Sequence, residues 1–539
     1  MRRRTARALL ACAAALGCML APLPLKAVDG DWPSFGYDYA NSRHVPFHQI
    51  DAHNVSSLRL TWKFSSGTYG KFEATPVVRD GVLYVVMPPD DTVVALDAAN
   101  GQVKWRYTPV LNPVKLCCGP VNRGVAVDRE HVYVATLDAR LIALQRRNGA
   151  VAWQATVAPP AEGYSETMAP LAWNGLVVVG ISGGDVGIGG FLTAYAAHDG
   201  KRLWRWYSVP HANGGGAIWM TPAVDERRAT LYAGTGNPFP MVDDRQRPGA
   251  NLYSDSIVAL DARRGTLRWY FQEVAGDQWN YDATSPPVLL DAVVHGRLTA
   301  AVAQAGKTGW LYVLDRDRGR LLRRSEAFVH QHNMFARPTE RGVYASPAGG
   351  AGAIAPIAWN PRLGRVYVTA VDQIHFARLA DPYWRPAGEA TQSVTAIDVN
   401  SGRLVWRRQF PPLGTIDGGL NSTNGPLATD ELVFVGEEST GRFDALDARS
   451  GDLLWQFQTT AGEPGAGVDV GFWTKLRDLL ASWKHALLRQ PRPPPASHIH
   501  DSPITYGVGG TQYVAVGGDA FYRTGDSSGD TLYVFALPR

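Results

Sequence analysis

The stretch ALDAANGQVKW, residues 95–105, sets the pattern of the whole chain. An apolar strand ends in Ala-Leu-Asp, three residues lead to a Gly, and three more lead to a Trp. The Asp side chain starts a turn by accepting hydrogen bonds from nearby backbone, and Gly accommodates the positive φ that the turn needs. The stretch therefore predicts a β-hairpin whose returning strand carries the Trp.

This pattern repeats, so one kind of unit builds most of the chain. A seventh copy, 313–323, keeps Gly319 but has Leu322 or Arg323 where the Trp would fall. Apolar or alternating segments around the copies supply the remaining strands. The other copies that end in Trp cover residues 143–153, 194–204, 259–269, 396–406 and 445–455.

One such unit cannot bury both faces of its sheet, so neighbouring units must stack. Radial closure removes unpaired sheet edges, and the copies are spaced about one four-stranded sheet apart. An open β-solenoid is the alternative, but this spacing favours a ring. Seven copies, with one more sheet closed by Trp62 near the start and residues 533–535 at the end, predict an all-β, eight-bladed β-propeller.

Residues 1–27 are typical of a signal peptide. Arg residues at positions 2–4 precede an apolar, Ala-rich run at 8–23, and we expect cleavage near Ala27. Lipid attachment at Cys18 is the alternative fate of this end. Residues 28–539 then form one exported propeller domain in the periplasm, and no later apolar run is long enough to span a membrane.

The composition excludes several classes of partner and cofactor. Charged residues make up 19% of the chain, and the net charge of +4 is spread along it, so no basic patch for a nucleic acid is apparent. No nucleotide fingerprint follows a strand-then-helix pattern, which argues against a nicotinamide enzyme. The motif Cys-x-x-Cys-His is absent, so this chain carries no covalently attached c-type haem.

The repeats resemble the Trp-docking motifs of the pyrroloquinoline quinone (PQQ) alcohol dehydrogenase family. The resemblance runs from Trp32 to the last residues, and segments 35–43 and 529–532 look like the two ends of that family's propeller. It implies PQQ as cofactor, with Ca²⁺ or a lanthanide ion beside it. Propellers without enzymatic activity also carry docking motifs, so the residues on the central face must decide between an enzyme and a scaffold.

Two segments resemble the parts of that family that enclose the quinone. LCCGPVNRG, 116–124, implies that a Cys117–Cys118 disulfide lies against one face of the quinone and that Arg123 contacts a cofactor carboxylate. The alternatives for the two Cys are unrelated buried thiols or a strained turn without a ligand. GGGAIW, 214–219, matches the segment whose Trp, here Trp219, lies under the opposite face. We expect its Gly run to let the backbone approach the ligand.

Single positions extend the resemblance to the cofactor's polar groups. Glu73 matches an acidic residue near the cofactor in relatives. Thr167 and Ser182 match positions that donate hydroxyl groups to it. Lys307 stands where the family has a Lys or Arg against the quinone carbonyls, and a cation there would stabilise the reduced quinone.

The metal ligands implied by the resemblance are oxygen donors, as a hard cation prefers. Asn237, in Gly-Asn-Pro, matches a ligand of the family. Asp185 stands where relatives have a Glu in a Gly-rich loop, and the usual Arg a few residues on is Gly189. Since Asp is one methylene shorter than Glu, we expect metal binding with altered geometry.

The general base is the largest departure from the family. Relatives have an Asp directly after a Trp, where this chain has Asn280, and a neutral amide cannot take the proton of an alcohol. Asp282 would share a face with Asn280 on a strand, and it is a candidate metal ligand or substitute base. Ala353 stands where relatives have a polar contact to the cofactor.

Residues 464–500 form an insertion before the closing strands. Apolar side chains at helical spacing within 470–490 predict a helix with basic residues around it, ended by the Pro-rich run 491–495. Such a helix packs on its own propeller, contacts a membrane surface or docks an electron acceptor. The loop residues His498, His500 and Asp501 are candidate metal ligands, but His-x-His on a loop is more often solvated.

Two functional hypotheses follow. The favoured one is a periplasmic PQQ-dependent oxidoreductase that oxidises an alcohol or aldehyde and passes electrons to an external acceptor such as a cytochrome c or a quinone. Its candidate catalytic residues are Asn280, Asp282 and Lys307. The alternative is a catalytically silent propeller, acting as a scaffold, sensor or cofactor-binding protein, which Asn280, Asp185 and Ala353 favour.

Overall fold

Strands joined by tight turns make up nearly all of the regular structure. The computed structural model describes residues 30–116, 118–210, 214–413, 424–438, 440–459, 468–469, 497–520 and 529–538. Within these ranges the only helices are short 3₁₀ turns, so the all-β prediction is confirmed. They are η1 (Val55–Ser57), η2 (Pro160–Glu162), η3 (Gly184–Val186) and η4 (Asp244–Gln246).

The first four sheets along the chain each contain four antiparallel strands in sequence order. The first comprises β2 (Val77–Arg79), β3 (Val82–Met87), β4 (Thr92–Asp97) and β5 (Val103–Tyr107). The second comprises β6 (Val125–Val127), β7 (His131–Thr136), β8 (Arg140–Gln145) and β9 (Val151–Thr156). The third comprises β10 (Leu171–Trp173), β11 (Leu176–Val179), β12 (Phe191–Ala196) and β13 (Arg202–Tyr207). The fourth comprises β14 (Ala223–Asp225), β15 (Thr230–Gly234), β16 (Ser256–Asp261) and β17 (Leu267–Gln272).

The next three sheets continue the same order. The fifth comprises β18 (Val288–Val294), β19 (Arg297–Ala305), β20 (Leu311–Asp315) and β21 (Leu321–Arg324). The sixth comprises β23 (Ala358–Asn360), β24 (Arg365–Asp372), β27 (Thr391–Asp398) and β28 (Leu404–Gln409). The seventh comprises β29 (Leu427–Ala428), β30 (Leu432–Glu437), β31 (Arg442–Asp447), β32 (Leu453–Gln458) and β33 (Val468–Asp469). A small extra sheet, inserted around the sixth, comprises β22 (Val343–Ala345), β25 (His375–Ala377) and β26 (Arg385–Pro386).

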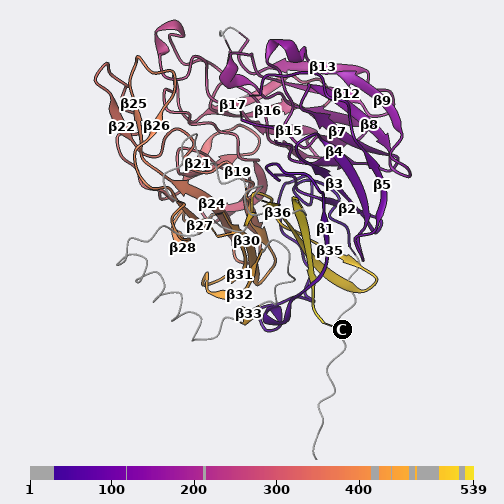
Figure 1. Ribbon diagram of the computed structural model, residues 1–539. Helices are drawn as coiled ribbons and strands as arrows, with labels where there is room; N and C mark the ends of the chain where they lie inside the picture. The colour runs from indigo at the N-terminus through magenta and orange to yellow at the C-terminus, as the bar shows by residue number, and fades with distance from the viewer. Residues whose placement is uncertain are drawn as a thin grey trace, which may run out of the picture.

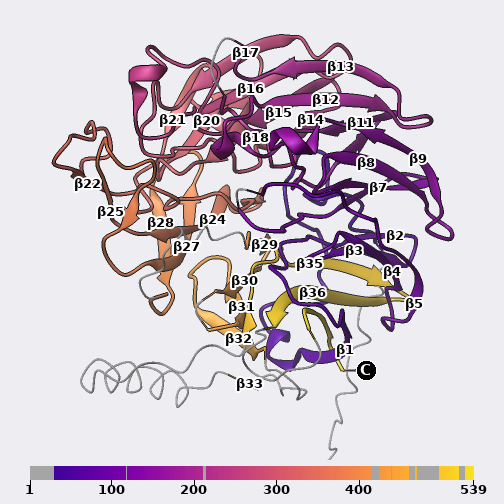
Figure 2. The same ribbon diagram turned by 45° about the horizontal axis from the view of Figure 1, so that its top comes forward.

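The last large sheet joins the two ends of the chain. Its strand β1 (Arg59–Ser65) pairs with β37 (Thr531–Ala536), which pairs with β36 (Thr511–Ala520). Strand β36 also pairs with β35 (Ile504–Val508) and with β34 (Ser497–His498). In Figure 2 the sheets pass round an axis from indigo to yellow, and β35 and β36 lie beside β2–β5, as they also do in Figure 1.

Six of the seven repeated Gly residues pack against a Trp of the preceding sheet. Gly149 has φ +72, and an ideal Cβ placed on it would lie 2.6 Å from the ring of Trp105. The Trp105 indole N–H donates to the carbonyl of Arg146 in the same turn, at 2.9 Å. In the copy that lacks the Trp, the side chain of Arg323 takes its place and lies against Gly402 of the next sheet. Further pairs are Trp62 with Gly101, Trp153 with Gly200, Trp204 with Gly265, Trp269 with Gly319, and Trp406 with Gly451.

The segment 32–45 crosses the middle of the ring and bonds to the innermost strand of one sheet after another. Its backbone pairs with Val78 of β2, Val224 of β14, Leu289 of β18, Trp359 of β23 and Ala428 of β29. Arg43 is fully buried, and its guanidinium donates to the carbonyls of Phe35, Pro426 and Pro503. One short segment therefore fastens most of the sheets to each other.

Parts of two predicted regions fall outside the described residues. The predicted signal peptide, 1–27, is one of them. Of the insertion 464–500, the structure describes strand β33, strand β34 and the residues that follow it, so the predicted helix at 470–490 stays a prediction. Among the residues that are described, no helix has both the length and the apolar character needed to cross a membrane.

Candidate functional site

Some of the predicted site residues lie just before the first strands of their sheets, and others, such as Asn237 after β15 and Lys307 after β19, follow a second strand. Glu73 precedes β2, Arg123 precedes β6, Trp219 precedes β14 and Asp282 precedes β18. The segment 32–45 bonds further along three of these strands, β2, β14 and β18. The site residues therefore gather near one end of these strands, and segment 32–45 lies further along them.

Glu73 lies between two cations. Its carboxylate oxygens are 2.7 Å from Lys71 Nζ and 2.7 Å from Arg123 Nη2, and its side chain is buried. Burial alone would raise the pKa of Glu73, but the charges of Arg123 and Lys71 lower it to about 2. The group of three thus carries one net positive charge at neutral pH.

Arg123 connects this ion pair to the two predicted hydroxyl donors and to the predicted Trp floor. Its Nη1 donates to Thr167 Oγ1 at 2.9 Å, and Thr167 Oγ1 lies 2.6 Å from Ser182 Oγ. Its guanidinium carbon is 4.7 Å from the ring centroid of Trp219, a cation–π contact. Arg123 Nε is buried with no hydrogen-bond partner among the described residues, which suits a site for an anionic ligand.

A second group surrounds Lys307, which is 3% exposed. Its Nζ donates to Asp282 Oδ2 at 2.7 Å and to Asn280 Oδ1 at 3.0 Å. The other oxygen of Asp282 accepts from the backbone N–H of Asn237 at 2.6 Å. The structure thus brings together all three candidate catalytic residues and one candidate metal ligand.

Asp185 completes the candidate metal site. It lies in η3, and a side-chain hydrogen bond links it to Asn237. Burial and the nearby charge of Asp282 raise the pKa of Asp185 above its ordinary value. Among the described residues no three His, Cys, Asp or Glu side chains converge to hold a metal, so a site here would need the Asn237 amide as its third ligand. Two carboxylates and an amide oxygen are donors that Ca²⁺ or a lanthanide accepts.

The Gly run before Trp219 packs closely against neighbouring loops, and its predicted approach to the ligand stays a prediction. An ideal Cβ on Gly215 would lie 2.5 Å from the carbonyl oxygen of Asn237, and one on Gly214 would lie 2.4 Å from that of Gly187. The backbone N–H of Gly216 donates to the Asn237 carbonyl at 2.8 Å. These Gly residues therefore allow the Trp219 segment to lie against the two loops that carry the metal ligands.

Two further sequence predictions concern single residues. Cys118 is exposed, and Cys117 lies outside the described residues, so their disulfide stays a prediction. Ala353 is buried, and its backbone N–H donates to Gly306, next to Lys307. A small apolar side chain thus occupies the position where the sequence resemblance predicts a missing polar contact.

The prediction that His498 and His500 are solvated is wrong for His500, which is 6% exposed. His500 Nδ1 is 2.5 Å from Asp519 and its Nε2 is 2.9 Å from Glu438. Burial opposes its protonation, but these carboxylates raise the pKa of His500 to about 10, so it is a cation at neutral pH. Asp501 accepts a hydrogen bond from the backbone N–H of Gly517 and does not join His500 in a metal site.

Sequence reasoning missed two buried carboxyl groups beside the site. Asp277 accepts from the backbone N–H groups of Trp279 and Tyr281, and burial raises its pKa to about 6. Asp255 is fully buried, and neither of its oxygens has a hydrogen-bond partner among the described residues. The Asp-x-Trp spacing of 277–279 is a turn signal that could have revealed the first, but nothing in the sequence marks the second.

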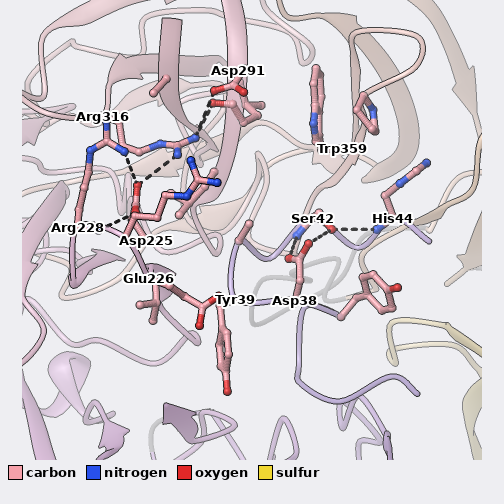
Figure 3. Close-up of a pocket in the computed structure, with 18 of the residues that line it drawn as sticks. Asp38, Tyr39, Ser42, His44, Asp225, Glu226, Arg228, Asp291, Arg316 and Trp359 are labelled. Atoms are coloured by element: carbon pink, nitrogen blue, oxygen red, sulfur yellow. Dashed lines mark hydrogen bonds and ion pairs between the residues drawn. The ribbon is translucent and has the colours of Figure 1, made fainter. Parts of the chain in front are cut away.

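A separate pocket of about 990 Å³ lies beside segment 32–45 (Figure 3). Its charged groups pair with each other: Asp225 binds Arg228 at 2.9 Å and Arg316 at 3.3 Å. Asp38 likewise accepts from the Ser42 hydroxyl at 2.7 Å. None of the predicted site residues lines this pocket, so the candidate site is the region that holds Glu73, Trp219 and Lys307.

Comparison with known proteins matches this architecture. The PQQ family model described as "Glucose/ethanol/alcohol dehydrogenase, beta-propeller domain" matches residues 32–340, and one described as outer membrane protein assembly factor BamB matches residues 387–470. The quinohemoprotein alcohol dehydrogenase ADH IIB of Pseudomonas putida is 32% identical over 94% of this chain and 78% of its own length. The lanthanide-dependent methanol dehydrogenase of Methylacidiphilum fumariolicum is 28% identical over 96% of this chain and 94% of its own.

A solved structure agrees with these matches. The crystal structure of the quinohemoprotein alcohol dehydrogenase from Comamonas testosteroni has a TM-score of 0.79 and 28% sequence identity to this chain. The alignment covers 94% of this chain and 80% of that one. The structural likeness therefore extends over nearly the whole chain.

Proposed function

The chain belongs to the PQQ family of glucose/ethanol/alcohol dehydrogenase β-propellers, and from this premise we propose that it oxidises an alcohol or aldehyde with PQQ and a metal ion. It is an alcohol dehydrogenase-like oxidoreductase. The observation that carries the proposal is the convergence of Lys307, Asp282 and Asn237 in one buried hydrogen-bonded group.

The cofactor residues fit a flat molecule that carries carboxylates. Arg123 has a free buried Nε and, with Lys71 and Glu73, belongs to a group with net positive charge. Thr167 and Ser182 add hydroxyl donors, and Trp219 offers an aromatic face. When bound there, PQQ would supply the two-electron oxidant that this chain's own side chains lack.

The metal would be held by Asp185, Asn237 and Asp282, and either Ca²⁺ or a lanthanide suits this donor set. A lanthanide-dependent methanol dehydrogenase among the relatives supports the second choice. Lys307 donates to Asp282 and so holds this carboxylate in place. Its charge would also stabilise negative charge that develops next to it.

Proton removal from the substrate is the step for which this site has the fewest suitable groups. Asn280 accepts a hydrogen bond from Lys307 and has no basic atom to offer an alcohol. Asp282 is the nearest carboxylate, and it would act as the base when an alcohol binds beside it. The second candidate function, a propeller that binds PQQ without turnover, rests on Asn280 and on the apolar Ala353.

The same family premise supports further proposals about the chain. The eight large sheets would be eight blades of a closed ring, and the Trp–Gly contacts between successive sheets would be its docking motifs. A Cys117–Cys118 disulfide would cover the second face of the quinone. The mature protein would work in the periplasm and pass electrons to a separate carrier, a cytochrome c or a quinone.

Reconstitution tests the proposal. The purified chain is mixed with PQQ and either Ca²⁺ or a lanthanide, and the absorbance of the bound cofactor is recorded before and after addition of a short alcohol. We expect bound cofactor to be reduced and an artificial dye to be reduced in turn. Tight binding without reduction by any alcohol or aldehyde would favour the silent propeller, and no binding would refute both functions.

A further inference from the structure

A pocket with aromatic walls lies on the surface close to Asn280 and Asp282. It has a volume of about 530 Å³ and is lined by Trp310, Phe335, Arg324, His332 and Asn333, among others. Trp310 and Phe335 are stacked with ring centroids 6.4 Å apart and an interplanar angle of 21°. Phe335 is 61% exposed, an unusual position for so large an apolar side chain.

The loop that carries Phe335 is fastened directly to the residues beside Asn280. The Trp279 indole N–H donates to the carbonyl of Ala336, and the Tyr281 hydroxyl donates to the carbonyl of Met334 at 2.7 Å. The rings of Tyr281 and Phe335 lie 6.2 Å apart between centroids. Tyr281 is fully buried between Asn280 and Asp282 in the sequence, so a short aromatic path joins the reactive group to the surface.

The polar groups at the rim are donors. The guanidinium of Arg324 lies 4.2 Å from the ring centroid of Trp310 and forms no ion pair or side-chain hydrogen bond within the described part of the chain. His332 is exposed at the same rim. Flat aromatic walls with donors at the edge fit a planar ring that carries carbonyl oxygens.

We propose that this pocket binds a quinone that accepts the electrons of the reaction, with its ring against Phe335 and Trp310 and a carbonyl toward Arg324. This inference rests on the proposed function, because it names the acceptor of that same site. Re-oxidation of the bound cofactor releases two electrons and two protons. A quinone that takes up both leaves as a hydroquinone, so electrons and atoms balance. The path through Tyr281 and Phe335 carries the electrons, and solvent carries the protons.

Binding is measured first, on the chain without PQQ. The probe is 2,3-dimethoxy-5-methyl-1,4-benzoquinone, which quenches Trp fluorescence, and Trp310 lies in the pocket. We expect a saturable component of quenching. Phe335→Ala should weaken it about three- to tenfold, the effect of losing one aromatic contact. Tyr344→Ala is the matched control, because Tyr344 is 54% exposed but lies outside the pocket lining.

Experiments on the protein with bound PQQ and metal then test this inference separately from the proposed function. Alcohol-dependent reduction of bound PQQ is followed by absorbance without any acceptor, and failure here refutes the proposed function alone. If reduction occurs, we expect Phe335→Ala and Arg324→Gln to raise the KM for the quinone, while Tyr344→Ala leaves it unchanged. Absence of saturable quenching, equal effects of the three variants, or loss of reduction of a c-type cytochrome without loss of quinone reduction would each overturn the acceptor site.

Discussion

Lys307 donates a 3.0 Å hydrogen bond to Asn280 Oδ1 and a 2.7 Å hydrogen bond to Asp282 Oδ2 across a separation of some two dozen residues. One ammonium group thus holds both the amide at the position predicted for the general base and the carboxylate two residues further on. This relationship leads to the first two predictions.

Asn280→Asp should raise alcohol-dependent dye reduction by the reconstituted protein. A carboxylate at this position accepts the hydroxyl proton, and a general base is typically worth on the order of 10²–10⁴ in rate. Lys307 already lies within hydrogen-bond distance, so the new charge has a partner. Asn280→Ala is the control and should give no gain. An unchanged rate in Asn280→Asp would show that the missing carboxylate at position 280 does not limit turnover.

Asp282→Asn should destabilise the metal-free protein, because it leaves the charge of buried Lys307 without its carboxylate. Breaking a buried ion pair in this way costs about 3–5 kcal/mol. Denaturant unfolding measures the loss. Asp317→Asn is the matched control: Asp317 pairs with Arg228 but is 62% exposed, and surface pairs are worth about 0–1 kcal/mol. Equal losses in the two variants would contradict the buried pair.

Stability should fall in alkaline solution through His500. The pKa of His500 is raised in the folded protein to about 10, above its ordinary 6.5, so protonation stabilises the fold. That contribution to the free energy of unfolding is fully present below about pH 6.5 and is lost as the pH rises to 10. It amounts to at most about 5 kcal/mol. The free energy of unfolding at pH 7 and pH 10 should therefore differ less in His500→Gln than in the wild type.

The matched control for this pH dependence is His198→Gln, because the His198 side chain is 80% exposed. It should follow the wild type at both pH values. A pH dependence of His500→Gln that is parallel to the wild type would show that the ion pairs with Glu438 and Asp519 do not stabilise the fold.

The contact between Gly149 and Trp105 can be tested with a pair of Gly substitutions. Gly149→Ala and Gly175→Ala both place a Cβ at positive φ, +72 and +78, at a cost of about 1 kcal/mol. Only the Cβ on Gly149 meets a ring, whereas nothing lies within 4 Å of the other. Gly149→Ala should therefore cost a further 1–3 kcal/mol, approximately the range for overpacking, in thermal unfolding. Equal effects would argue against the docking role of Trp105.

The sequence predicted local patterns well and long-range partners poorly. The Gly-Trp spacing was enough to locate the hairpins, because turn and strand are decided within a few residues. That Gly149 meets Trp105 of the preceding sheet, and that Arg323 replaces the missing Trp, depends on how sheets stack. The family prediction is confirmed by the matches to the PQQ propeller and to alcohol dehydrogenases.

The same contrast between local patterns and long-range partners holds for the candidate site. Asp185 and Asn237 were chosen one by one, and that the Gly214–Gly216 segment packs against the loops carrying them could be seen only in the folded chain. His500 was expected in solvent, since two His on a loop carry no signal of burial. Its partners Glu438 and Asp519 come from other strands, so only the folded chain could show that the imidazole is enclosed between carboxylates.

The pairing of β1 with β37 has a consequence for how the molecule is made. These strands are joined late, because residues near position 60 must wait for residues near position 535 before their edge is covered. Until synthesis ends, the growing chain presents an open template for pairing with other chains. Loss of strand β37 after folding would leave β1 without its partner and would expose a strand edge that other chains could pair with.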